Sequence, residues 1–149
     1  MIASPQRWLS SVLYFIAVFH IGMGIGLTLS PGFQQWAAAL YGAEMDWTDQ
    51  ATYFVRIIGT FALVVGLVVL SAARRPVAHT GIVVALAAFF LLRNGIRHVH
   101  SAELYAGFSV SSGVNLITSA FFGLLAAALF GLLWASRRRN GLAATEPDS

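Results

Sequence analysis

The sequence predicts an all-α, polytopic membrane protein: a bundle of four transmembrane helices with a short amphipathic helix in its first outer loop. Three observations support this fold class. Of the 149 residues, 58% are hydrophobic and only 10% are charged, whereas soluble domains carry roughly 25% charged residues. Four apolar stretches divide the chain, each about 20 residues long, which is the length that a helix needs to cross a bilayer. Four spans cannot close a barrel, so the spans must be helices, whose backbone groups bond internally.

We expect the four spans to form one domain that covers residues 1–139. The spans are placed at approximately 8–30, 53–72, 77–98 and 112–135. The first apolar run is too long for a cleaved signal peptide, and the small residues that follow it are too distant. The polar residues 140–149 are expected to form a disordered cytoplasmic tail.

The loop after the first span contains helix signals of its own. Ser30 and Pro31 are typical of an N-cap followed by the first helical position, and Gly42 is a typical stop. Apolar side chains recur between them at helical spacing: Phe33, Trp36, Ala37 and Leu40. These features predict a short amphipathic helix on the outer surface. Asp46 or Thr48 is then expected to cap the second span.

The arginines predict the orientation, because Lys and Arg are in excess in cytoplasmic loops. All nine basic residues are arginines, and the loop between the first two spans has none and three acids. Six arginines flank the other ends of the spans: Arg7, Arg74, Arg75, Arg137, Arg138 and Arg139. We therefore expect a multi-pass membrane protein with both termini cytoplasmic. Anionic membrane lipids, and not nucleic acid, are the expected partners of these arginines.

Small residues at helical spacing mark the expected helix-packing faces. Membrane helices associate where small side chains allow close approach. The candidate glycines form one pair on each of three spans: Gly22 and Gly26, Gly59 and Gly66, Gly123 and Gly131. Such faces serve either the bundle itself or contact with another integral membrane subunit or a second copy. The fourth span, which adds Ala127 to its stripe, is the best candidate for an external contact.

Polar residues concentrate in the predicted outer half of the bilayer. Arg93 and Arg97 are four apart on the third span and share a face. Arginine inside a membrane is costly and functional by default, so an acid such as Glu103 is an expected partner of Arg93. The candidate ligand-binding residues are His20, Arg56, Arg93, Asn94, Arg97, His98, His100, Glu103 and Asn115.

Three interpretations of this cluster remain open. The arginines can simply reach lipid phosphates and loop acids, or the cluster can bind an anionic or quinone-like headgroup. As a third possibility, His20, His98 and His100 can hold a metal or haem. Spacing argues against the third, because His98 and His100 point in different directions on a helix and His20 lies at another depth. We therefore assign no metal ligands and no cofactor.

The sequence offers no catalytic residues. It contains no cysteine, which excludes thiol nucleophiles and thiolate metal sites. No carboxylate pair is placed for acid–base chemistry, and the Gly22–Gly26 run is helical packing and not a dinucleotide fingerprint.

The chain resembles the DoxX-like group of small bacterial four-helix membrane proteins. The resemblance covers roughly residues 8–100. It rests on the end of the first span at Leu29-Ser30-Pro31, the short outer helix, the stretch Arg56-Ile57-Ile58-Gly59 with Gly66, and the Arg74-Arg75 turn. It implies a protein of the bacterial inner membrane that is an accessory or partner subunit of a membrane oxidoreductase system.

Three functions are therefore expected, in this order. The first is a non-catalytic accessory subunit that packs against other membrane proteins, in a redox or respiratory assembly. The alternative is a binding or transport protein that holds an anionic lipid, a quinone or an acidic metabolite at the outer Arg/His cluster. The second alternative is a haem or metal membrane enzyme.

Overall fold

The computed structural model describes residues 4–143, with side chains described as far as residue 139. All regular secondary structure in this part of the chain is helical. The six helices are α1 (Pro5–Leu29), α2 (Pro31–Leu40), α3 (Asp49–Ala73), α4 (Thr80–Val99), α5 (Ser101–Phe108) and α6 (Ser112–Ala143). Four of them, α1, α3, α4 and α6, are long and apolar enough to cross a membrane. The predicted fold class is therefore confirmed.

Local signals account for the helix starts. The Ser30 hydroxyl accepts a hydrogen bond from the Phe33 amide, and the Thr48 hydroxyl accepts one from the Ala51 amide, each at 3.2 Å. Both bonds satisfy an amide that has no partner inside its helix. Of the two predicted caps for the second span, Thr48 and not Asp46 takes the position.

Helices α1 and α3 pack into one close pair. A Cβ built on Gly24 would lie 2.5 Å from the backbone nitrogen of Leu63, and one on Gly66 would lie 2.8 Å from the backbone nitrogen of Ile21. Gly59 is similarly close to Thr28. Glycine at these points lets the two backbones approach, as small residues do at membrane helix interfaces.

Not all of the predicted packing glycines lie at contacts within the chain. Gly26 packs against the Phe33 ring of α2, and Gly123 lies beside the Asn94 amide. A Cβ on Gly22 or Gly131 would have no described atom within 4 Å. The α1 face that meets α3 therefore contains Gly24 and not the predicted Gly22.

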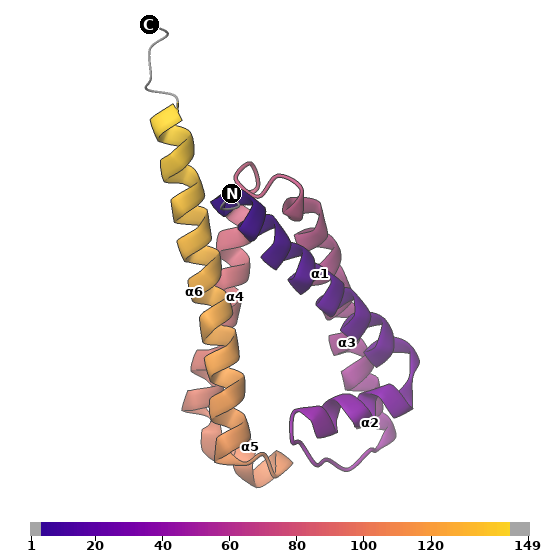
Figure 1. Cartoon of the computed structure of the whole chain (residues 1–149). Helices are drawn as coiled ribbons and strands as arrows, with labels where there is room; N and C mark the ends of the chain where they lie inside the picture. Colours follow the sequence, from indigo (N-terminus) through magenta and orange to yellow (C-terminus); the bar gives the residue numbers. More distant parts are fainter. Residues whose placement is uncertain (1–3, 144–149) are drawn as a thin grey trace, which may run out of the picture.

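Helices α4 and α6 form the second pair, and the two pairs meet through α1 and α6 (Figure 1). The side chains at their junction form one apolar core, in which the Phe90 and Phe122 rings lie 5.3 Å apart between centroids. Toward α2 and α5 the two pairs diverge (Figure 1). The divergence leaves room for a cavity between the pairs.

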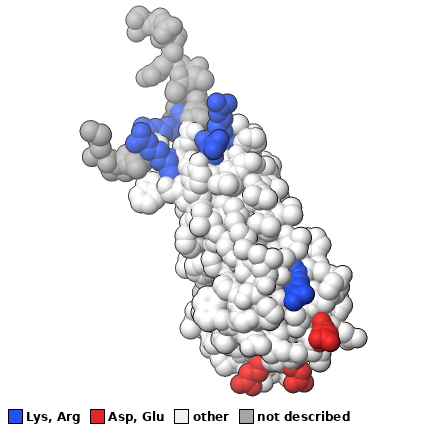
Figure 2. All heavy atoms as spheres, turned by 90° about the vertical axis from the view of Figure 1, so that its right-hand side faces the viewer, with Lys and Arg blue, Asp and Glu red and all other residues white. Residues whose placement is uncertain are grey.

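The bundle has two chemically different ends. The start of α1, the turn between α3 and α4 and the end of α6 lie together (Figure 1), and arginines gather there (Figure 2). Acidic side chains gather at the opposite end (Figure 2), where α2 and α5 lie. We call these the arginine-rich end and the acidic end.

The outer faces of the long helices are apolar. Large side chains such as Val18, Phe61 and Leu124 are each about two-thirds or more exposed, at 66%, 67% and 71%. Exposing such apolar faces to water would be unfavourable, whereas contact with lipid is compatible with them. The exposed surface therefore agrees with a protein immersed in a bilayer.

Two details differ from the sequence analysis. Helix α2 forms as predicted but buries Gln34 and Ala37, while Trp36 and Leu40 face outward. The Gln34 amide nitrogen donates to the Leu27 carbonyl at 2.6 Å, one of the free carbonyls at the end of α1. Helix α5 was not predicted at all.

The end of the chain also differs from the predicted tail over residues 140–149. Helix α6 continues to Ala143, so the tail's first four residues are helical. The other six, residues 144–149, lie outside the described part of the chain.

Candidate functional site

The diverging helix pairs enclose a cavity of about 390 Å³, within the size range of small-molecule sites. Side chains from α1, α3, α4 and α6 line it, together with Tyr41 directly after α2. Its lining is mostly apolar, and three side chains bring polar groups to it: His20, Tyr41 and Arg93. An apolar pocket with a few polar groups is the usual form of a binding site.

Arg93 is the charged group of this cavity. Its guanidinium carbon lies 3.9 Å from the centroid of the Phe122 ring and 5.8 Å from that of Tyr41. Aromatic faces attract a cation through their quadrupole, so these rings position the guanidinium. The terminal nitrogen Nη1 of Arg93 is buried and has no hydrogen-bond partner among the described groups.

No carboxylate neutralises Arg93 in the part of the chain with described side chains. Glu103, the expected partner, instead approaches Nδ1 of His100 with both oxygens at 3.1 Å. That pair is exposed, and it is the one ion pair found among residues 4–139. Glu44, Asp46 and Asp49 are exposed at the acidic end. The expected Arg93–Glu103 pair is therefore wrong, because α5 turns Glu103 toward His100.

His20 contributes a ring nitrogen from α1. Its Nδ1 lies 2.8 Å from the carbonyl oxygen of Ile16, and a carbonyl can only accept a hydrogen bond. Nδ1 therefore carries the proton, which leaves Nε2 of the neutral ring as an acceptor. The His20 and Phe90 rings lie 6.2 Å apart between centroids.

A second set of polar side chains joins α4, α5 and α6 beside the cavity. Arg97 Nε donates to Asn115 Oδ1 at 2.9 Å, and Asn115 Nδ2 donates to the Tyr105 hydroxyl at 3.3 Å. Asn94 Nδ2 donates to the backbone carbonyl of Ser119 at 2.8 Å. These bonds fix the face of α4 that carries Arg93.

Loop contacts join the two helix pairs at the acidic end. The Glu44 amide donates to the Phe108 carbonyl at 2.8 Å, which joins the loop after α2 to the end of α5. Gly42, with φ of +65°, lies against Val114 at the start of α6. That left-handed backbone favours glycine, and it brings the loop against the start of α6.

The structure divides the nine predicted ligand-binding residues into three groups. His20 and Arg93 line the cavity, and Asn94, Arg97 and Asn115 support it from the α4–α6 contact. The remaining four are exposed and do not line it: Arg56, His98, His100 and Glu103. Among residues 4–143 no three His, Cys, Asp or Glu side chains group as metal ligands.

Sequence reasoning missed two contributors to this site, Tyr41 and Phe122. Tyr41 ends α2, a helix that the sequence did predict, but its direction depends on how α2 folds back against α1. Phe122 belongs to an apolar run in which no position stands out. No signal in one sequence would have assigned either ring to Arg93.

Comparison of the chain with family models, with curated proteins and with solved structures gives no match. The function of the cavity must therefore be inferred from the residues that line it.

Proposed function

We propose that this protein binds an anionic headgroup inside the membrane, at Arg93 between the two helix pairs. The observation that carries the proposal is a buried guanidinium nitrogen with no partner among the described groups. A cation inside a membrane is normally paired, and no described carboxylate is paired with this half-buried arginine. An anion that enters the cavity would supply both the missing charge and the missing hydrogen-bond acceptor.

The position of Arg93 supports a ligand that comes from the bilayer. Arg93 lies six residues before the end of α4, which is roughly 9 Å along the helix axis. With the end of α4 at the membrane interface, the guanidinium would lie below the headgroup region, where an intramembrane charge is costly unless it serves a site. The apolar remainder of the lining accommodates the hydrocarbon part of an amphiphile.

Native mass spectrometry of the delipidated protein in mild detergent tests the proposal. We would add oleate, oleyl alcohol and decylubiquinone in separate experiments. Oleate should remain bound at one per chain, and the uncharged oleyl alcohol should be lost, because only the anion pairs with Arg93. Equal retention of the two, or preferential retention of decylubiquinone, would contradict an anion site.

Two substitutions at Arg93 sharpen the test. Arg93→Gln removes the charge and should weaken oleate binding by about tenfold or more, the usual effect of a lost charged hydrogen bond. Arg93→Lys keeps the charge but not the planar fork of donors, so it should retain part of the binding. Arg75→Gln, in the exposed turn after α3, is the matched control and should bind as the unchanged protein does.

A second candidate function is the accessory subunit that the DoxX-like resemblance implies. It is favoured by the outer face of α6, where Ala127 and Gly131 are exposed and meet no other helix of the chain. Small exposed residues allow a foreign helix to approach closely. Gly131→Leu should then release a membrane partner that copurifies with the protein from its native membrane, whereas a partner retained by this variant would contradict the assignment.

We also infer the orientation from the charge difference between the ends. The arginine-rich end is expected to face the cytoplasm of a bacterial inner membrane, because positive residues are retained on that side. The Arg93 cavity would then lie in the outer leaflet. Reporter fusions after Arg75 and after Asp46 test this, and an external reporter after Arg75 would overturn it.

A further inference from the structure

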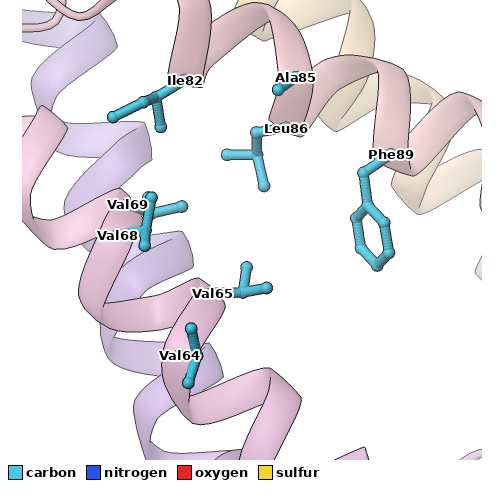
Figure 3. A pocket seen from close by; sticks show the side chains of 8 residues that line it. All are labelled: Val64, Val65, Val68, Val69, Ile82, Ala85, Leu86 and Phe89. Atoms are coloured by element: carbon cyan, nitrogen blue, oxygen red, sulfur yellow. The ribbon is translucent and has the colours of Figure 1, made fainter.

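A second hollow lies beside the cavity, between α3 and α4 (Figure 3). Its volume is about 280 Å³, and only apolar side chains line it. Valines of α3 and Ile82, Ala85 and Leu86 of α4 face one another across it (Figure 3). We call this hollow the α3–α4 groove.

The groove adjoins the Arg93 cavity. Val65 and Phe89 line both spaces, so the two spaces meet at these two side chains. Ile82 lies eleven residues before Arg93 on the same helix, which corresponds to roughly 16 Å along the axis. The combined space therefore has a charged part at Arg93 and an apolar part that extends toward the arginine-rich end.

The groove is open to the surrounding lipid. Val64, Val68 and Phe89 are about half exposed, at 53%, 45% and 46%, although all three line it. Helices α3 and α4 are joined by a short turn, yet most of their packing is with other helices. A hydrocarbon chain can therefore enter sideways from the bilayer without unfolding the bundle.

We propose that the ligand is a long-chain carboxylate whose single hydrocarbon chain lies in the α3–α4 groove and whose carboxylate pairs with Arg93. This inference rests on the proposed anion site and names its ligand class. A carboxylate fits the planar fork of an arginine side chain. The groove, at about 280 Å³, is below the usual size of a drug-like site, so it suits one chain and not two.

The order of the charged part and the apolar part along the bundle matches the order of headgroup and chain in a lipid leaflet. The charged part lies nearer to the acidic end of the bundle, and the groove lies deeper, toward the arginine-rich end, where Ile82 is two residues from the start of α4. Ile82 and Arg93 are separated by roughly 16 Å along α4, so a chain that starts at Arg93 and fills the groove would pass the middle of the roughly 30 Å hydrocarbon core. A carboxylate lipid of the leaflet at the acidic end would thus enter with its carboxylate toward Arg93 and its chain toward the groove.

The two parts of the site make different contributions. Lipid tails are as apolar as the groove, so moving a chain from the bilayer into it gains little free energy. Affinity must then come from Arg93, while the groove determines where the chain lies. The decisive measurement is therefore the position of the bound chain and not its affinity.

Photocrosslinking with two carboxylate probes in the bilayer-reconstituted, full-length protein tests this. One probe is hexadecanoic acid with a diazirine beside the carboxylate, and the other carries the diazirine at its middle carbon. We expect the first to label the surroundings of Arg93, and the second to label α3 within 64–69 and α4 within 82–89. Arg93→Gln should lower both labels by about tenfold.

The two probes separate failure of this inference from failure of the proposed function. Head labelling at Arg93 with mid-chain labels spread over the outer faces of α1 and α6 would overturn the groove and leave the anion site intact. No head labelling at Arg93 would overturn both. Ala85→Trp, which fills the groove, should remove the mid-chain label but keep the head label. The matched Ala120→Trp, on an exposed face of α6, should change neither, and equal loss in both variants would count against the groove.

Discussion

Asn94 Nδ2 lies 2.8 Å from the carbonyl oxygen of Ser119 and joins α4 to α6 one helical position after Arg93. The same nitrogen lies 3.6 Å from where a Cβ of Gly123 would be. A small residue at 123 therefore lets the amide reach the α6 backbone. This contact holds the face of α4 that presents the guanidinium to the cavity.

Asn94→Leu should destabilise the α4–α6 pair. The substitution removes an interhelical hydrogen bond, which is worth about 1 kcal/mol inside a membrane. Thermal unfolding in detergent, followed by tryptophan fluorescence, measures the loss. Thr60→Val is the control, because Thr60 bonds only to Arg56 of its own helix. Equal losses in the two variants would contradict the role of Asn94.

Gly24→Ala should separate α1 from α3. The added Cβ would meet the Leu63 backbone at 2.5 Å, and overpacking of this kind costs about 1–3 kcal/mol. Gly22→Ala, two residues away on the same helix, meets no described atom within 4 Å and should leave stability unchanged. The free energy of unfolding of both variants in mixed micelles checks the difference, and a larger loss for Gly22→Ala would be inconsistent with the pairing.

Asn115→Leu should cost more stability than Tyr105→Phe. The first change leaves the half-buried Arg97 without its acceptor, a loss of about 2 kcal/mol for a charged group. The second removes only a 3.3 Å bond to an exposed tyrosine, worth about 0.5 kcal/mol. The order of the two melting temperatures tests the network, and a reversed order would contradict it.

Arg93→Met should stabilise the protein when no ligand is bound. The change replaces a half-buried cation that no carboxylate pairs with an apolar side chain, which removes the cost of an intramembrane charge. The same change should abolish the rise in melting temperature that bound oleate produces in the unchanged protein. A lower melting temperature of the delipidated variant would mean that the stacking of Arg93 on Phe122 outweighs that cost.

The sequence determined the fold class, the number of spans and most of α2, because each depends on the order of nearby residues. Apolar length requires a helix in lipid, and Ser30 and Thr48 mark helix starts through bonds three residues away. The sequence also identified Arg93 as an unusual charge and His20 as a possible neighbour.

Only the tertiary structure decided which of these residues share a site. The rotation of each helix about its own axis depends on packing, so Gly24 and not Gly22 meets α3, and Arg56 and His98 face outward. The turn of α5 decided that Glu103 approaches His100 and leaves Arg93 without a carboxylate. The spread of the two helix pairs, which opens the cavity beside Arg93, is a property of contacts between distant segments, and no pattern of neighbouring residues contains it.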